Sequence, residues 1–474
     1  MLFCSFQFFA FFSIVFVLYW LIRWREARVW LLLVASYYFY ASWSHWLALL
    51  IVVSTALDYV IARRIESSSS PRWRTFLLCT SLTANLGLLA YFKYANFFLR
   101  SVEQALAAAG AAASLPVLKV ILPIGISFYT FEAINYVVDV YLGKMKAERN
   151  LAHFMLFILF FPHLIAGPIV RARDFLPQIR RRKHWDWARL HLGMQYFIMG
   201  LFKKLAIADR MALFADPVFA NPEQYNTGAL WLGALAYTFQ VYCDFSGYTD
   251  MALGAAHMLG YKLAQNFNMP YLSANISEFW RRWHISLSTW LRDYLFIPMG
   301  GSRFGRLKTV RNLLVTMTLG GLWHGANWPF VAFGFIQGCW LSSHLVFREF
   351  CKSRPAITTL LQSGPGTALR IAGTFVTFCC TLVIFRATSL HSGFVMLRNM
   401  ATPREGIGTP LHNRSFWCLF AVIVIAHMLG QRNLWRTVMD HFPAPVRGFA
   451  YASVLTVALL LAPESDKAFV YFQF

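Results

Sequence analysis

Two histidines lie in tryptophan-rich stretches of the chain. His324 lies in residues 320–328, which read GGLWHGANW, and His284 lies in residues 280–286, which read WRRWHIS. An unperturbed imidazole has a pKa of about 6.5, so its neutral form can take a proton from a hydroxyl group at neutral pH. A hydroxyl activated in this way can attack a thioester. The pattern therefore indicates acyl transfer.

His324 is the sharper candidate for a general base. Three glycines flank it and let the backbone bend or approach another group closely. Trp323 and Trp328 are expected to exclude water, and Asn327 can orient a polar partner. An ionisable side chain at membrane depth is costly and indicates a functional site by default. The alternative is a core histidine that is held by hydrogen bonds and takes no part in chemistry.

His284 belongs to an expected amphipathic helix over residues 278–292. At about 100° per residue, His284 falls on an aromatic and leucine-rich face, with arginines on the opposite side. Such a helix fits the membrane interface. His284 at such a position is a candidate for a functional role. The alternative is an inert histidine at the level of the lipid headgroups.

Further polar groups lie in the largely apolar residues 229–261. Asp244 and Asp250 would point about 240° apart on a helix, so they are not expected to form one acid pair. We expect Gly247 to break this stretch into two helices with the polar groups at a cavity wall, and helix caps at a turn are the alternative. The candidates for contacts to the substrate or to the histidines are Asp244, Asn327, Trp323 and Gln240.

A membrane protein must position these residues. The 474 residues are 58% hydrophobic and 14% charged, whereas about a quarter of the residues in a soluble domain are charged. We expect an all-α polytopic protein with one integral domain over residues 1–474 and about 11–13 membrane segments. Residues 1–22 lack a basic region and a cleavage site, so we expect a retained first span and not a signal peptide.

The basic residues predict the topology. The net charge is +22, and most Lys and Arg residues cluster in short loops between apolar segments. The positive-inside rule explains this pattern, so no nucleic acid is expected as a partner. It places residues 63–74 and 171–183 in the cytoplasm and the N-terminus on the opposite side of the membrane.

Two apolar segments have specific expectations. Residues 117–141 are long enough to span the membrane as a helix. Residues 154–169 read FMLFILFFPHLIAGPI, and the prolines and glycine predict a broken or re-entrant segment. A proline-kinked span is the alternative.

Several other chemistries have no support in the sequence. No GxSxG, HExxH or GxxxxGK[ST] motif is found, and none of the eight cysteines pairs with another at CxxC spacing. We therefore expect no bound metal, no disulfide framework and no use of nucleoside triphosphates.

Several motifs, in their order along the chain, resemble those of the membrane-bound O-acyltransferase family, and within it the bacterial alginate O-acetyltransferase branch. The resemblance covers essentially the whole chain. Its motifs are FPHLIAGP at 161–168, DFSGYTD at 244–250, FWRRWHIS at 279–286 within residues 266–301, WHGANW at 323–328, FRA at 385–387 and FVYFQF at 469–474.

The resemblance implies a ring of helices around a thinned centre, with opposed funnels that meet at a narrow tunnel. It implies that His324 is the catalytic histidine and His284 the second histidine of the family. It also implies that acetyl groups move from a cytoplasmic donor, expected to be acetyl-CoA as a co-substrate without any bound cofactor, to a polysaccharide outside, such as alginate or cellulose. A separate extracytoplasmic acetyltransferase is the expected partner, beside membrane lipid.

Three alternatives to this function stay open. The acceptor could be peptidoglycan, or the reaction could be D-alanyl or other acyl transfer to a cell-wall polymer. A protein of another class, a transporter of acyl groups without chemistry of its own, would tolerate loss of His324.

Overall fold

The computed structural model describes residues 1–43, 45–111, 114–165, 167–411, 413–431 and 441–462. Within these residues the regular structure is helical, apart from one isolated bridge between Tyr225 and Ile407. The chain divides into two compact units: unit 1 is formed by residues 1–197 and 249–264, and unit 2 by residues 198–248 and 265–474. The all-helical prediction is confirmed. The expected single integral domain and the ring of helices stay predictions.

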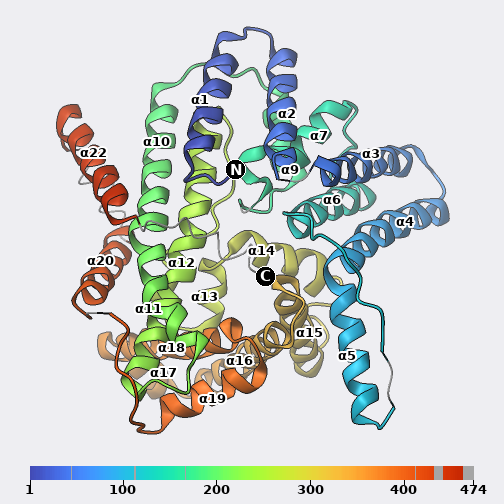
Figure 1. The fold of residues 1–474 in the computed structure, drawn as a ribbon. Helices are drawn as coiled ribbons and strands as arrows, with labels where there is room; N and C mark the ends of the chain where they lie inside the picture. The colour runs from blue at the N-terminus through green and yellow to red at the C-terminus, as the bar shows by residue number, and fades with distance from the viewer. Residues whose placement is uncertain (44, 112–113, 166, 412, 432–440, 463–474) are drawn as a thin grey trace. The chain divides into compact units, whose positions relative to one another are not determined.

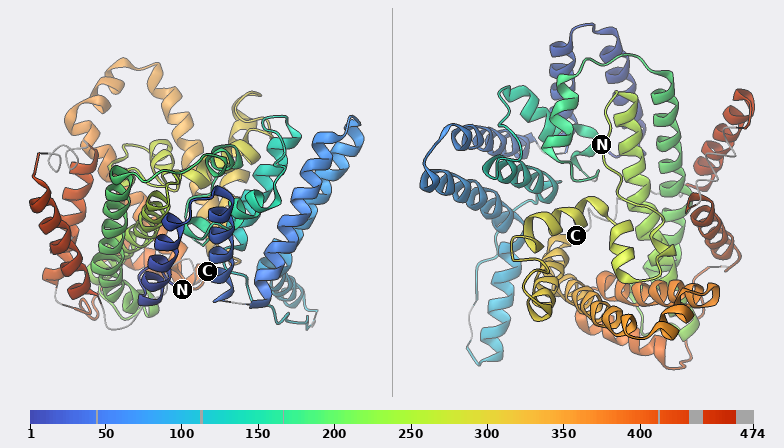
Figure 2. Two further views of the ribbon diagram at one scale, coloured as in Figure 1. Left: turned by 90° about the horizontal axis from the view of Figure 1, so that it is seen from above. Right: turned by 180° about the vertical axis from the view of Figure 1, so that it is seen from behind.

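Unit 1 contains the N-terminal helices. Its first helices form because apolar runs follow strong caps: the Ser5 hydroxyl accepts a hydrogen bond from the Phe8 amide at the start of α1, and Ser70 caps α4 in the same way. Helices α3, α4 and α6 pack against one another (Figures 1 and 2). The helices are α1 (Phe6–Leu21), α2 (Arg25–Ala41), α3 (His45–Ser67), α4 (Pro71–Leu89), η1 (Ala90–Tyr94), α5 (Ala95–Ala108), α6 (Ile126–Tyr141), α7 (Leu151–Leu159), α8 (Phe161–Leu164), α9 (Ala172–Arg180) and most of α10 (Trp187–Leu201).

The expected span over residues 117–141 is helical only from Ile126 onward. Pro123 cannot donate a backbone hydrogen bond, and Gly125 adopts a φ of 73° directly before α6. A Cβ atom at Gly125 would also lie 2.7 Å from the carbonyl oxygen of Leu164. The prediction of a helix over residues 117–125 was therefore wrong, because regular helical structure begins only at Ile126.

The predicted break in residues 154–169 is confirmed. Helix α7 ends before Phe160, which has non-helical backbone angles, and the single turn of α8 follows it. The buried imidazole of His163 then lies 3.3 Å from the carboxylate of Glu132 on α6. Glu132 also accepts a hydrogen bond of 2.8 Å from the amide of Val170, so two points after the break are attached to α6.

Unit 2 contains the helices that carry both histidines. Its helices α15 and α16 lie side by side and form a hairpin (Figures 1 and 2). The helices of this unit are η2 (Phe202–Ala208), α11 (Asp209–Ala220), most of α12 (Thr227–Met258), η3 (Pro270–Leu272), α13 (Ile276–Arg282), α14 (Ile285–Leu291), η4 (Arg292–Phe296), α15 (Arg306–His324), α16 (Trp328–Lys352), α17 (Pro355–Gln362), α18 (Gly364–Arg386), α19 (Leu390–Ala401), α20 (Asn413–Gln431) and α22 (Ala444–Leu461).

Helix α12 is continuous, so the expected break at Gly247 was wrong. Gly247 instead allows close packing. A Cβ atom at this position would lie 2.7 Å from the carbonyl oxygen of Gly200 and 3.2 Å from the amide nitrogen of Lys204. Any side chain here would push η2 away from α12, which explains a glycine inside a helix.

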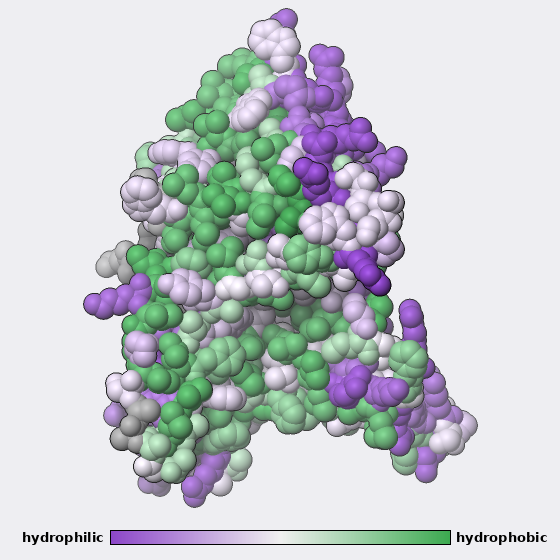
Figure 3. Space-filling view, turned by 90° about the vertical axis from the view of Figure 1, so that its right-hand side faces the viewer, coloured by the Kyte–Doolittle hydropathy of each residue, from purple (hydrophilic) through white to green (hydrophobic). Residues whose placement is uncertain are grey.

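Among the described residues, six helices are long and apolar enough to cross a membrane, and α1 is a shorter apolar helix. Hydrophobic side chains cover much of the surface seen in Figure 3, which fits contact with lipid. The multi-pass prediction is confirmed, whereas the count of about 11–13 segments stays a prediction. The six helices are Trp46–Ser67, Pro71–Ala108, Trp328–Lys352, Gly364–Arg386, Asn413–Gly430 and Ala444–Leu461.

Candidate active site

The hairpin of α15 and α16 positions His324. A Cβ atom at Gly321 would overlap the carbonyl oxygen of Phe330, and one at Gly334 would overlap the carbonyl oxygen of Met317. The two helices therefore approach as closely as their backbones allow. His324 is the last residue of α15, and the extended backbone of Gly325 leads directly into the turn before α16.

Aromatic rings surround the imidazole of His324. The side chain is buried, and its ring centroid lies 5.2 Å from that of Trp323, 5.3 Å from that of Phe385 and 6.5 Å from that of Phe333. All three contacts are edge-to-face, the arrangement that aromatic pairs prefer. The cage limits the rotation of the imidazole and keeps bulk water from most of its surface.

The backbone of His284 has an unusual conformation. His284 lies between α13 and α14 with a φ of 42°, in the left-handed region that non-glycine residues rarely adopt. Asn266 holds this turn: its carbonyl oxygen accepts a hydrogen bond of 2.9 Å from the Ile285 amide, and its side chain accepts one of 2.6 Å from the Ser286 hydroxyl. The continuous helix predicted over residues 278–292 was therefore wrong.

Burial controls the electrostatics of His284. The residue is fully buried, and neither ring nitrogen has a hydrogen-bond partner within the part of the chain that the structure describes. It lies outside the six candidate spans. Burial, and then the nearby His324, lower the pKa of His284 well below its ordinary value. The imidazole is therefore neutral at physiological pH.

Trp323 connects the two histidines. Its indole ring lies 5.8 Å from the ring of His284 and 5.2 Å from that of His324, measured between centroids. On its other side, His284 contacts Phe245 of α12 at 4.7 Å. The two histidines that the sequence singled out therefore belong to one buried aromatic cluster, and Trp323 lies at its centre.

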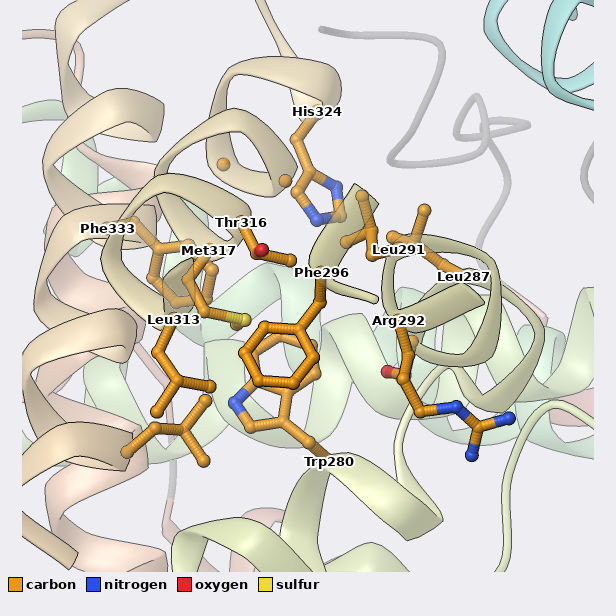
Figure 4. A pocket seen from close by; sticks show the side chains of 14 residues that line it. Trp280, Leu287, Leu291, Arg292, Phe296, Leu313, Thr316, Met317, His324 and Phe333 are labelled. Atoms are coloured by element: carbon orange, nitrogen blue, oxygen red, sulfur yellow. The ribbon is translucent and has the colours of Figure 1, made fainter. Parts of the chain in front are cut away.

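A cavity of about 200 Å³ reaches the ring of His324. Figure 4 shows the imidazole pointing toward the space between Leu291, Thr316 and Phe296. His284 is not among the residues that line this cavity. The lining residues are Trp280, Leu287, Ser288, Leu291, Arg292, Phe296, Leu313, Thr316, Met317, Gly320, Gly321, His324, Phe333 and Leu341.

The lining determines which ligand the cavity suits. Most of it is apolar, and the indole nitrogen of Trp280 is already turned to Gln337, which accepts its hydrogen bond at 3.3 Å. A concave apolar site with one imidazole suits a small apolar group next to a reacting atom. It does not suit a sugar chain, whose many hydroxyl groups would lose hydrogen bonds to water.

Asp244 has a different partner from the one expected. Its carboxylate lies 2.8 Å from the ammonium group of Lys204, which also lies 2.8 Å from the carboxylate of Asp209. All three side chains are buried. The next residue after Asp244 is Phe245, which contacts His284. Asp244 is therefore adjacent in the chain to a residue of the aromatic cluster, and its expected role at the site stays a prediction.

The remaining candidates do not gather at the histidines. Asn327 caps α16 by accepting a hydrogen bond of 2.8 Å from the Trp328 amide. Trp328 is 48% exposed at the start of a candidate membrane span, so its expected role in excluding water stays a prediction. Gln240 is buried one turn before Asp244, and no contact between described residues connects it to either histidine.

Sequence reasoning missed two residues of this region. Lys204 was not selected, although a lysine in the apolar stretch 192–205 was a usable signal. Asn266 was included only as the start of a motif, because its contacts with residues 285 and 286 depend on the turn. The motif at residues 469–474 lies outside the described residues.

Residues 146–385 match the family model of the membrane-bound O-acyltransferases. The chain is 44% identical to the probable alginate O-acetylase AlgI of Azotobacter vinelandii over 94% of each chain, and 40% identical to that of Pseudomonas putida over 98% of each. It is 36% identical to the peptidoglycan O-acetyltransferase of Helicobacter pylori, over 79% of this chain and 73% of that protein.

Proposed function

Because the chain belongs to the membrane-bound O-acyltransferase family, we propose that it is a membrane O-acetyltransferase that supplies acetyl groups to an extracellular polysaccharide of the alginate type. The observation that carries this proposal is the imidazole of His324 at the wall of an apolar cavity. The similarity to alginate O-acetylases, which exceeds that to the peptidoglycan O-acetyltransferase, supports the choice of polymer.

In the proposed reaction, His324 is the general base. Its neutral imidazole takes the proton of the acceptor hydroxyl while the hydroxyl oxygen attacks the carbonyl carbon of an acetyl thioester. The carbon–sulfur bond then breaks, and the leaving thiolate takes up the proton. His284 would orient the donor or stabilise the negative charge that develops on the carbonyl oxygen.

The distribution of charge supports the proposed donor and the proposed orientation in the membrane. We take acetyl-CoA as the donor, which would be a co-substrate and not a bound cofactor. The basic residues 171–183 and 303–311 would attract its phosphates on the cytoplasmic side. We take the bacterial inner membrane as the location, where the positive-inside rule orients the N-terminus toward the periplasm.

Complementation tests the function. In a strain that secretes alginate but lacks its own membrane O-acetylase, expression of this chain should restore acetyl esters on the secreted polymer. If the chain is expressed and inserted but only peptidoglycan gains acetyl esters, the similarity to the Helicobacter pylori enzyme becomes the better guide. If no polymer gains acetyl groups while labelled acetyl groups still cross the membrane, the chain is a transporter.

The protein should need an extracytoplasmic partner to acetylate the polymer. The cavity at His324 is about 200 Å³ and largely apolar, so a hydrated polysaccharide is not expected to enter it. Proteoliposomes that contain the purified protein, acetyl-CoA and alginate should leave the alginate unmodified, and adding an alginate-binding acetyltransferase should start acetylation. Efficient acetylation without that addition would show that the polymer itself reaches the site.

Replacing His284 should lower activity less completely than replacing His324. We expect a loss of roughly 10²-fold, the size found when one group that stabilises a developing charge is removed. Because His284 has a φ of 42°, alanine would also strain the backbone, whereas asparagine tolerates this conformation. Both His284→Ala and His284→Asn should therefore lose acetylation. If the asparagine variant kept full activity, His284 would be needed only for its backbone.

Thr316→Leu should reduce the use of the donor. Thr316 is buried and lines the cavity, so a larger side chain there removes space beside His324. We expect a KM for acetyl-CoA several-fold higher, with a smaller effect on kcat. Thr318→Leu is the matched control, because it makes the same change on α15 outside the cavity lining. Equal effects of both substitutions would count against the cavity as the donor site.

A further inference from the structure

A cluster of cations lines a small cleft in unit 1, away from both histidines in the sequence. One segment comes from the region where α1 ends and α2 begins, and the other follows α9 directly. The rings of Tyr19 and Tyr261 form part of the walls. The cations are Arg23, Arg25, Arg28, Arg181, Arg182 and Lys183.

Main-chain carbonyl groups hold the two segments together. The guanidinium of Arg28 donates one hydrogen bond to the carbonyl oxygen of Ile22 at 2.7 Å and another to that of Lys183 at 2.9 Å. Arg25 donates to the carbonyl oxygen of Arg180 at 3.0 Å. Carbonyl oxygens orient these cations without neutralising their charge. These two arginines are therefore already in place before a ligand arrives, which favours binding.

Carboxylates balance little of this charge. Among the described residues, Glu26 is the one carboxylate that forms an ion pair with a cation of the cleft, and its partner there is Arg25. Arg28 instead lies over aromatic rings, 5.0 Å from the centroid of Tyr19 and 5.0 Å from that of Trp20. The cleft therefore keeps an excess of positive charge.

The environment of the cleft changes the pKa of Lys183. Its ammonium nitrogen lies 4.2 Å from the centroid of the Tyr261 ring. Burial, followed by the charges of Arg189 and Arg181, lowers the pKa of Lys183 to about 8. An anion bound in the cleft would reverse this effect, because it favours the charged form of the lysine.

We propose that this cleft binds a phosphate group, carried by the headgroup of an anionic phospholipid or by a soluble phosphate ester. The guanidinium group of an arginine can form two parallel hydrogen bonds to the oxygens of one phosphate. The one carboxylate paired with a cation of the cleft, that of Glu26, leaves most of this capacity unused. The enclosed space of about 10 Å³ admits one group the size of a phosphate oxygen. The other oxygens would face Arg181 and Arg182, whose side chains are exposed at the rim. Residues 181–183 of this cleft also belong to the basic stretch proposed above to attract the phosphates of the donor, so the site is tested by binding alone, without acyl transfer.

The location of the cleft fits both sources of phosphate. Residues 23–28 directly follow the apolar helix α1, and basic residues next to a membrane segment attract anionic lipid headgroups. The same residues lie on the side that the positive-inside rule assigns to the cytoplasm, where soluble phosphate esters are abundant. A binding experiment with a lipid probe and a soluble phosphate probe is needed to separate these two sources of phosphate.

The experiment compares two pairs of arginines in the full-length protein. The double substitution Arg181→Gln and Arg182→Gln removes two exposed charges from the cleft. Arg63→Gln and Arg64→Gln is the matched control, since it removes an exposed adjacent pair from α3 outside the cleft. Native mass spectrometry measures retention of phosphatidylglycerol against phosphatidylcholine with the same acyl chains. Calorimetry with inorganic pyrophosphate measures the soluble probe.

We expect the cleft variant to bind at least one probe roughly 20- to 30-fold more weakly than the wild type, since each basic residue near a membrane surface contributes roughly a fivefold factor. The control pair should bind like the wild type. A loss confined to phosphatidylglycerol identifies a lipid site, and a loss confined to pyrophosphate identifies a soluble ligand. Equal binding of both probes by the cleft and control variants would overturn the proposal.

A pH series adds a second readout with the probe that binds. The groups that face Lys183 are Arg28, Arg181, Arg189 and the ring of Tyr261, and the arginines keep their charge between about pH 7 and 9. Binding requires charged Lys183, so it should weaken as the pH rises through about 8. The Lys183→Arg variant stays charged and should bind equally across this range. The same pH dependence in both proteins would remove Lys183 from the site.

Discussion

Replacing His324 with alanine should abolish acetylation of the polysaccharide while the protein remains inserted at its normal level. Loss of a general base lowers the rate by about 10²–10⁴-fold. The substitution leaves the hairpin of α15 and α16 intact, because the close approach of Gly321 and Gly334 does not involve the imidazole. The measurement is the acetyl content of the secreted polymer, together with the amount of protein in the membrane.

Two further variants make this test specific. His324→Gln keeps a polar side chain of similar size but has no basic nitrogen, so it should be as inactive as the alanine variant. His344→Ala removes a histidine from α16 that does not line the cavity, so it should stay active. Wild-type acetylation by either His324 variant at equal expression would show that His324 is a core histidine or belongs to a transporter.

Replacing Lys204 with methionine should destabilise the protein and lower its activity. The substitution leaves the buried carboxylates of Asp209 and Asp244 without the ammonium group that lies 2.8 Å from each. Breaking a buried ion pair by removing one partner costs about 3–5 kcal/mol in the free energy of unfolding. Activity should fall as well, because Asp244 precedes Phe245, whose ring contacts His284 at 4.7 Å.

The neighbouring lysine and a charge-neutral variant are the controls for Lys204. Lys203→Met removes the adjacent, only half-buried lysine and should change thermal stability in detergent much less. A triple variant, Lys204→Met with Asp209→Asn and Asp244→Asn, removes the unpaired charges and should recover part of the stability. A stable and fully active Lys204→Met protein would show that the buried ion pairs of Lys204 with Asp209 and Asp244 are not needed to hold α12 in position.

The sequence alone determined the class of the protein and its two main histidines. Long apolar runs with few charges can bury their backbone polar groups in lipid only as helices, so an all-helical membrane protein followed from composition. His324 stood out because glycines and tryptophans are its neighbours in the sequence. The break after residue 159 was also predictable, since Pro162 and Gly167 disfavour a regular helix.

Other features depended on contacts between distant segments. Periodicity placed His284 on a continuous helix, but the hydrogen bonds that Asn266 accepts from Ile285 and Ser286 hold a left-handed turn at that residue. Gly247 looked like a helix break because its packing partner, Gly200, is far away in the sequence. The buried ion pair of Asp244 with Lys204 could not be read from the sequence, because the two residues lie far apart in the chain.

The sequence therefore determined what depends on local composition: the helices, their apolar surfaces and the identity of the basic groups. Only the tertiary structure decided which side chains meet. It placed Trp323 between the two histidines, opened the cavity to His324 and not to His284, and gathered six cations from two distant segments into one cleft. The physical reason is that packing and hydrogen bonds act between residues close in space, whereas a sequence pattern records only neighbours along the chain.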